Sequence, residues 1–148
     1  MKSEPDVFGI DDLAKKRVEG WNGVRNYQAR NFMKTMRVGD GVLFYHSNAA
    51  PSGVAGLAEV CRTAYPDATQ YDRKSDYYEP RATKDAPVWF QVDLKFVAKL
   101  PRLVSLDELK GMPELQKMPL VNRTRLSVMP VTDVEWDAIV ARAKSPAP

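Results

Sequence analysis

The sequence has very little cysteine and histidine, with one of each, Cys61 and His46, among its 148 residues. A single cysteine excludes an intramolecular disulfide, and we expect the reducing setting of the cytoplasm for such a chain. The same scarcity excludes a zinc site built from histidine and cysteine, so we expect no metal and no cofactor. A nucleophilic Cys–His pair stays geometrically open, but Cys61 lies in an apolar segment that reads V-C-R. Because free cysteine packs as a small hydrophobe, we expect Cys61 in the core.

Long apolar runs and the common catalytic motifs are also absent. No segment approaches the roughly 18 apolar residues that span a bilayer, so we expect no membrane partner. The sequence contains no P-loop, G-x-G-x-x-G, H-E-x-x-H or G-x-S-x-G motif. Two acidic pairs, Asp11–Asp12 and Asp107–Glu108, fall in the first turns of predicted helices, where negative charge favours the helix dipole. No catalytic constellation is therefore visible, and we do not expect an enzyme.

The composition is that of an ordinary globular protein, with 44% hydrophobic and 28% charged residues. It predicts a single domain over residues 1–144, with 145–148 as a disordered tail. The net charge of +3 and the pI of about 9.0 are compatible with nucleic acid but do not require it. We expect a monomer.

Hydrophobic periodicity predicts a mixture of short helices and irregularly spaced strands. The helices are expected over 11–18, 26–36, 106–110 and 133–143, and the strands over 42–46, 54–63, 88–98 and 126–131. Loops are expected over 2–6, 48–53 and 67–87. Gly56 predicts a bulge or a close backbone approach, and Ser105 with Glu108 and Thr132 with Glu135 predict capping boxes. The fold class that follows is α+β, a small mixed β-barrel decorated with short α-helices.

The segment Trp21–Asn31, which reads W-N-G-V-R-N-Y-Q-A-R-N, carries the most chemistry. It combines two aromatic rings that can stack, two guanidinium groups and several carboxamides. Such a set can hold a planar, hydrogen-bonding ligand, and a nucleobase fits that description. Each residue also has a structural interpretation, because Trp21 could be core and Tyr27, Arg30 and Asn31 could form a solvated helix face.

A second polar group follows the predicted strand 42–46. Tyr45, His46, Ser47 and Asn48 either close loop hydrogen bonds or form the polar rim of a pocket. Taken alone, the segment K-S-E at 2–4 has the composition of a frayed terminus.

Taken together and in order, seven segments resemble the EVE domain family. They are K-S-E-P-D at 2–6, W-N-G-V-R-N-Y-Q-A-R-N-F-M at 21–33, G-D-G-V-L-F-Y-H-S-N at 39–48, G-V-A-G-L-A-E-V at 53–60, A-Y-P-D at 64–67, V-D-L-K-F-V at 92–97 and R-L-S-V-M-P-V at 125–131. The resemblance implies a PUA-like fold, similar in plan to the YTH domains that bind adenine methylated on its exocyclic amine within RNA. It implies a reader of modified bases in DNA or RNA with no chemistry of its own. The family's short aromatic strand before K-S-E-P does not precede this segment here: either the strand is truncated, which would leave an unpaired sheet edge, or the true start lies upstream.

The function hypothesis is a nucleic-acid-binding module that holds a modified base flipped out of DNA or RNA. The base would be methylated or hydroxymethylated cytosine, or methylated adenine. Trp21 is the first choice for a stacking wall, with Tyr27 or Tyr45 as the second, and one arginine is expected to tie the helix to 125–130. The expected ligand-binding residues are Ser3, Trp21, Arg25, Asn26, Tyr27, Arg30, Tyr45, His46, Ser47, Asn48 and Arg125, and the expected phosphate contacts are Lys2, Arg30 and Lys34.

Two other interpretations stay open. A hydrolase or transferase acting on modified nucleotides would need an acid or base near the pocket, and Glu4, Asp40 and His46 are the candidates. A binding module for a nucleotide-like or anionic metabolite, or for a protein partner, would use the same pocket without nucleic acid.

Overall fold

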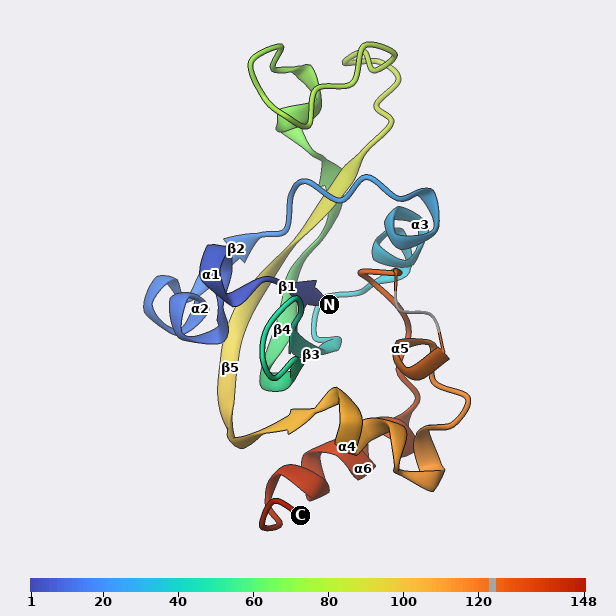
Figure 1. Cartoon of the computed structure of the whole chain (residues 1–148). Coiled ribbons are helices and arrows are strands. Elements are labelled where there is room, and N and C mark those ends of the chain that lie inside the picture. Colours follow the sequence, from blue (N-terminus) through green and yellow to red (C-terminus); the bar gives the residue numbers. More distant parts are fainter. Residues whose placement is uncertain (123–124) are drawn as a thin grey trace.

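The computed structural model describes residues 1–122 and 125–148. Its centre is a five-stranded sheet with the strand order β1-β3-β4-β5-β2, in which β1 pairs parallel with β3 and the other pairs are antiparallel. Figure 1 shows that β4 and β5 form a long twisted ribbon that extends beyond the rest of the sheet. The strands are β1 (Lys2–Ser3), β2 (Val18–Gly20), β3 (Gly41–His46), β4 (Gly53–Pro66) and β5 (Phe90–Ser105).

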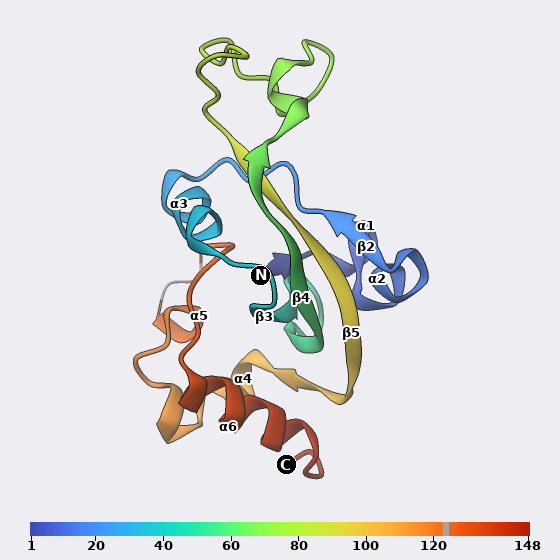
Figure 2. The ribbon, with the colours of Figure 1, turned by 180° about the vertical axis from the view of Figure 1, so that it is seen from behind.

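Short helices surround the sheet. Figure 2 shows α1 and α2 beside one edge, α3 on the opposite side, and α4, α5 and α6 gathered at the lower end. Among the described residues no strand pair joins β1 to β2, so the sheet is open rather than a closed barrel. The helices are α1 (Pro5–Phe8), α2 (Ile10–Lys16), α3 (Tyr27–Thr35), α4 (Leu106–Lys110), α5 (Pro119–Asn122) and α6 (Asp133–Ala143), with 3₁₀ turns at Ala68–Tyr71 and Pro113–Leu115.

Two apolar clusters hold these elements on the sheet. One cluster joins α2 and α3 to the sheet and includes Ile10, Met33 and Phe44, each at most 1% exposed. The other joins the C-terminal helices to β3 and β4 and includes Leu109 and Ile139, both fully buried. The described helices include none that is both long and apolar enough to cross a membrane.

Gly56 is the close approach that the sequence predicts. The β4–β5 register shifts between Val54 and Gly56, and a Cβ on Gly56 would lie 2.4 Å from the side chain of Ile10. The missing side chain therefore lets α2 pack directly on the sheet.

Side-chain caps define the starts of three helices. Asn26 accepts a hydrogen bond from the backbone N–H of Ala29 and caps α3. Thr132 and Glu135 form the predicted capping box of α6. Ser105 caps α4 as predicted, but the Glu108 carboxylate bonds to two arginines instead of completing a box.

Three local predictions are wrong. Residues 126–131 form no strand; their apolar pattern reflects burial of Leu126 and Val128, and Lys2 N donates to Ser127 O across 2.9 Å. Residues 2–6 contain β1 and the start of α1 instead of a loop, because β1 is stabilised by pairing with the distant β3. Cys61 is half-buried on β4 and is not a core residue.

The segment between β4 and β5 is more than a surface loop. Figure 1 shows it as an arm beyond the end of the sheet, and we call residues 67–88 the arm. Its base is buried, since Asp67 and Gln70 have no exposed surface. The Gln70 amide donates to Asp67 O and Trp89 O and accepts from the N–H groups of Val88 and Trp89. Buried hydrogen bonds rather than apolar packing therefore fix the arm to the ribbon.

Candidate functional site

A cavity of about 500 Å³ lies where β1 and α1 meet the segment that follows β2. It brings together the K-S-E-P-D and W-N-G-V-R segments and one side chain from the arm. The residues that matter for its chemistry are Ser3, Phe8, Trp21, Val24, Arg25 and Tyr77.

Trp21 forms an apolar wall of the cavity and belongs to the core at the same time. Its indole is 9% exposed and meets the rings of Phe44 and Phe8 edge-on, with centroids 5.5 and 6.4 Å away. The Trp21 backbone N–H donates to Val92 O on β5 across 2.8 Å. The core interpretation of this residue is therefore confirmed, and these contacts fix its position at the cavity wall.

Ser3 contributes its backbone and a hydroxyl group to the neighbouring wall. The Ser3 Oγ donates to Phe8 O across 2.6 Å and so holds α1 against β1. The Ser3 carbonyl accepts from the backbone N–H of Ser47 across 2.9 Å. These two bonds connect the cavity wall to the end of β3.

Gly23 allows the arm to reach the cavity. Its φ of +79° lies in the left-handed region, and a Cβ there would lie 2.9 Å from Tyr77 Cζ. The Gly23 N–H donates to the Asp67 carboxylate across 2.8 Å. Glycine is thus required at position 23 both by the positive φ and by the tyrosine ring that lies directly on its backbone.

Asp67 is a buried carboxylate that joins the cavity wall to the arm. It accepts hydrogen bonds from Gly23 N–H, from Arg25 Nη1 at 3.1 Å, and from the N–H and hydroxyl of Thr69. Burial alone would raise the pKa of Asp67, but the bonds from Thr69, Gly23 and Arg25 together lower it. The carboxylate therefore stays ionised and fully bonded.

Arg25 uses its whole guanidinium group within the protein. Nε and Nη2 donate to Tyr77 O, Nη1 donates to Val24 O and Asp67, and Nη2 also donates to Thr69 Oγ1. These contacts account for the five donors that a guanidinium has. Arg25 carries structural hydrogen bonds, and their partners lie in the arm rather than in 125–130, where we expected an arginine's partner.

Other predicted site residues lie outside the cavity on α3. Asn26 uses its side chain to cap that helix. Tyr27 stacks on Trp89 with a centroid distance of 4.9 Å and accepts a hydrogen bond from Arg81. Arg30 donates to Val88 O across 2.9 Å. This part of α3 therefore braces the base of the arm.

The residues at the end of β3 also point away from the cavity. Tyr45 is 5% exposed and packs in the C-terminal cluster. His46 Nε2 accepts from the backbone N–H of Ile10 across 3.1 Å, and burial lowers the pKa of its imidazole. The backbone N–H of Ser47 donates to Ser3 O, and Asn48 Nδ2 donates to Glu4 Oε1 across 3.0 Å. The side chains of His46 and Asn48 therefore close loop hydrogen bonds, which is one of the two alternatives that the sequence leaves open.

The remaining cations predicted for the site, Lys2, Lys34 and Arg125, lie in different places. Lys2 lines the cavity, and its ammonium lies 5.8 Å from the centroid of the Tyr45 ring. Lys34 lies 4.6 Å from the centroid of the Phe90 ring, and Arg125 is exposed. Neither Lys34 nor Arg125 lines the cavity.

Sequence reasoning missed several residues of the cavity, above all Phe8, Val24 and Tyr77. Phe8 and Val24 lie in segments whose neighbours were identified, so their positions could have been found there. Tyr77 lies in a polar stretch without periodicity, and its partner Gly23 is 54 positions away. Gly23, in the N-G pair at 22–23, was the one signal in the sequence that another segment could approach that backbone.

Acidic side chains are scarce in the lining of the cavity. Among the described residues, its single acidic lining side chain is Glu19, which pairs with Lys16 across 2.8 Å. The described residues contain no group of three or more His, Cys, Asp or Glu that could hold a metal ion. A second cavity, of about 530 Å³, lies between α3, β3 and α6 near Phe32 and Trp136; it contains none of the residues expected to bind the base, but the acid–base candidate Asp40 lines it.

Comparison with known proteins places this geometry in a family. A model of the EVE domain matches residues 1–142. The chain belongs to the EVE domain family. This EVE domain is 39% identical to human thymocyte nuclear protein 1 over 160 residues, which covers 95% of this chain and 71% of that protein.

Solved structures of relatives superpose on this EVE domain along nearly its whole length. A hypothetical protein from Leishmania major is 53% identical, with a TM-score of 0.93, covering 97% of this chain and 92% of that one. Human THYN1 protein in complex with 5-methylcytosine containing DNA is 38% identical, with a TM-score of 0.95, covering 99% and 97%. The α+β, PUA-like fold class predicted from the sequence is thereby confirmed.

Proposed function

We propose that this EVE domain is a reader that binds DNA containing 5-methylcytosine, with the modified base extruded into the cavity beside Trp21. The observation that carries the proposal is the superposition, over 99% of this chain, on a human protein that was crystallised with such DNA. We further propose a monomer that acts in the cytoplasm.

The cavity has the properties that a flipped base requires. Its volume of about 500 Å³ falls within the roughly 300–1,000 Å³ typical of small-molecule sites. A duplex hides the faces of its bases, so a protein that inspects a modification must take the base out of the stack. Trp21 and Tyr77 supply aromatic surface for that base, and stacking contributes on the order of 1–3 kcal/mol per base.

The methyl group itself would be recognised by apolar contact. Phe8 and Val24 line the cavity beside Trp21 and provide such a surface. Burying one methyl group is worth about 0.8 kcal/mol, which is roughly a four-fold preference. We therefore expect modest discrimination between methylated and unmodified cytosine, together with a strong dependence on salt.

A binding role is favoured over catalysis by the state of the ionisable groups. All three acid–base candidates already have hydrogen-bond partners within the protein. Asp40 accepts from Arg37 N–H, and His46 accepts from Ile10 N–H. The third, Glu4, accepts from Asn48. None of the three lines the cavity, so we propose that no reaction takes place there.

The test is a titration of the intact protein with matched oligonucleotides, followed by fluorescence anisotropy. The duplexes carry cytosine, 5-methylcytosine or 5-hydroxymethylcytosine at one position, and RNA and methylated adenine serve as further arms. We expect 5-methylcytosine DNA to bind several-fold more tightly than unmodified DNA. Equal affinity for every oligonucleotide, or no binding, would refute the proposal and favour a small-molecule ligand.

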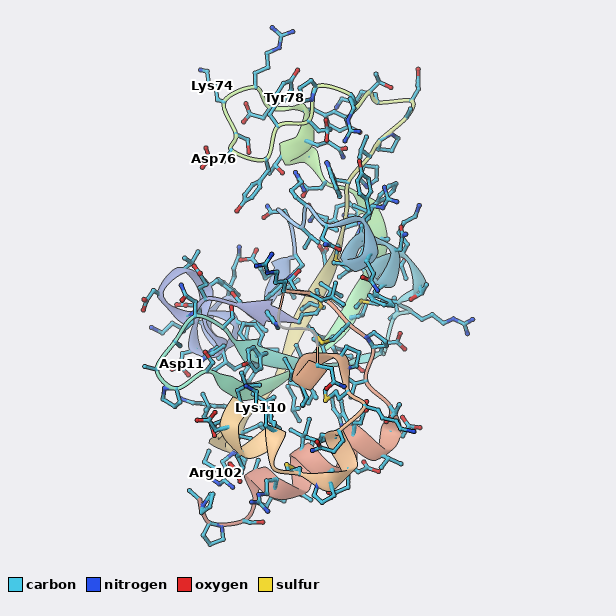
Figure 3. The ribbon with its side chains drawn as sticks, turned by 45° about the vertical axis from the view of Figure 1, so that its right-hand side comes forward. Asp11, Lys74, Asp76, Tyr78, Arg102 and Lys110 are labelled. Atoms are coloured by element: carbon cyan, nitrogen blue, oxygen red, sulfur yellow. The ribbon has the colours of Figure 1, made fainter. Side chains whose placement is uncertain are left out.

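Variants locate the binding site in the same experiment. Trp21→Phe keeps an aromatic ring in the core, and we expect it to reduce the preference while the protein stays folded. Trp21→Ala should abolish the preference, with circular dichroism checking the fold. Lys110→Ala removes an exposed cation at the end of α4, outside the lining of the cavity (Figure 3), and should bind like the wild type.

A further inference from the structure

Tyr77 is an exposed aromatic side chain at the edge of the cavity. It is 44% exposed, although it lines the cavity and its ring lies on the backbone of Gly23. Large aromatic side chains usually bury most of their surface on folding. An aromatic ring that is held in place and remains nearly half exposed has surface available to a ligand.

The arm that carries Tyr77 is folded rather than loose. Tyr77 N–H donates to Ser75 Oγ across 3.1 Å, and Ser75 N–H donates to Asp72 O across 3.0 Å. Glu79 N–H donates to Gln70 O at the buried base of the arm. The position of Tyr77 is therefore set by hydrogen bonds on both sides of it along the chain.

Arg25 attaches this part of the arm to the cavity wall. Two of its donors meet Tyr77 O, at 3.2 and 2.8 Å, and its guanidinium carbon lies 5.2 Å from the Tyr77 ring and 5.4 Å from the Trp89 ring. The other donors bond to Val24 O, Asp67 and Thr69. Because all five donors are used, the group has none left for a phosphate.

The geometry points to Tyr77 as a second aromatic wall of the base site, in addition to Trp21, and to Arg25 as the positioning residue that holds it there. This inference rests on the proposed function, because it assumes that a base enters the cavity. It gives the arm a direct part in recognition: an extruded base lies against the tyrosine ring, and the nucleic acid next to it passes over the arm. Arg25 acts on the ligand only through Tyr77.

The test measures binding of 5-methylcytosine DNA by variants of the intact protein. Tyr77→Ala should weaken binding about ten-fold, within the range expected for loss of one stacking side chain. Tyr77→Phe keeps the ring and should bind within about two-fold of the wild type. Lys74→Ala removes a cation at the far end of the arm (Figure 3) and serves as the control for general effects on the arm.

A double-mutant cycle tests the role assigned to Arg25. Arg25→Gln should weaken binding, but Arg25→Gln combined with Tyr77→Ala should bind no more weakly than Tyr77→Ala alone. Arg25→Lys keeps a positive charge beside Asp67 while losing the planar fork, and it should resemble Arg25→Gln. Thermal unfolding of each variant establishes that it is folded under the binding conditions.

Salt dependence separates positioning from direct phosphate contact. Loss of a phosphate contact would lower the slope of log K against log salt concentration by about 0.9 for a duplex. We expect the Arg25→Gln slope to equal that of the wild type. A smaller slope, or additive effects in the cycle, would overturn the role of Arg25.

The outcomes distinguish this inference from the proposed function. Wild-type affinity in Tyr77→Ala, with methyl preference intact, would overturn the second wall and leave the reader standing. A wild-type protein without preference for 5-methylcytosine DNA would overturn both.

Discussion

Glu108 shows how much structure one side chain can organise. Its carboxylate accepts two hydrogen bonds from Arg102, at 2.8 and 2.7 Å, and one from Arg142 at 2.5 Å. The Glu108 side chain is 4% exposed, and the three residues belong to α4, β5 and α6. The hydrogen bonds from Arg102, followed by those from Arg142, outweigh burial and lower the pKa of Glu108 from 4.5 to about 2.

This network predicts a pH-dependent part of the stability. Because the folded pKa of Glu108 lies below its unfolded value, its contribution is complete above about pH 4.5 and is lost as the pH falls towards 2. Glu108→Gln should lower the free energy of unfolding at pH 7 by about 2 kcal/mol. This is below the roughly 3–5 kcal/mol for a fully buried pair, because both arginines are partly exposed.

Urea unfolding of both proteins between pH 2.5 and 7 measures the effect. The difference between wild type and Glu108→Gln should shrink below pH 4.5. A difference that is constant across this range would show that the carboxylate charge is not what stabilises the contact.

For single residues, the sequence predicts which residue types are important more accurately than it predicts what each of them contacts. Trp21, Ser3 and Lys2 line the cavity, because their segments form its walls. Arg25 and Arg30 were predicted to meet phosphate or to carry structural bonds, and both bond to the arm. Their acceptors in the arm, such as Asp67 for Arg25 and Val88 for Arg30, lie more than 40 residues away in sequence, where local pattern gives no information.

Among the elements, the start of β4 illustrates a close approach between two strands. A Cβ on Gly53 would lie 2.3 Å from Val104 O and 2.8 Å from Ser105 Cα on β5. Backbone atoms cannot move aside as the tip of a flexible side chain can. Gly53 is therefore needed for the register of the long ribbon.

Gly53→Ala should lower the free energy of unfolding by more than about 2 kcal/mol, as expected for a change that overpacks a rigid site. Gly111→Ala is the matched control, since a Cβ there would lie 3.5 Å from Glu108 O, an ordinary contact, and the backbone φ is −85°. Chemical denaturation of both variants gives the comparison. Equal stabilities for the two variants would mean that β4 and β5 can separate at this end without cost.

Element prediction works where the pattern is local and long. The helix at 26–36 and the strand at 42–46 are found as α3 and β3 within one residue or so of their bounds. The two-residue β1 has no periodicity of its own and exists only because β3 offers it a partner. The reverse holds for 126–131, where alternation marks two buried side chains on an irregular segment.

For the molecule as a whole, the ribbon and the arm differ in how they are stabilised. β4 and β5 lie between two apolar clusters, whereas the arm beyond its buried base is held by exposed and half-buried hydrogen bonds. Stability is therefore expected to be uneven along the chain.

Hydrogen exchange should reveal this difference. Amides of Val60 and Leu94 should exchange only through global unfolding, while that of Tyr77 should exchange through local opening with a free energy several kcal/mol lower. On addition of 5-methylcytosine DNA, the amides of Tyr77 and Gly23 should slow together, because one network holds both. Slowing at Gly23 without slowing at Tyr77 would place the arm outside the complex.

The fold class could be predicted from the sequence because apolar periodicity and a family resemblance agree. The open sheet and the folded arm could not, because both depend on which edges and polar groups meet in space. Gln70 is the clearest example of this limit: it lies in a stretch of polar residues, yet it is buried and its side chain makes four hydrogen bonds.

The anchoring of the arm has a practical consequence for protein engineering. Asp67, Gln70 and Arg25 secure its base and the position of Tyr77, while the stretch around Lys74 and Asp76 lies at its outer end (Figure 3). The exposed side chains of Lys74 and Asp76 can be varied there, provided that Ser75, which accepts a hydrogen bond from Tyr77 N–H, is kept. A library randomised at these exposed positions, with the rest of the domain unchanged, is a direct route to EVE domains that read different sequence contexts around the same base.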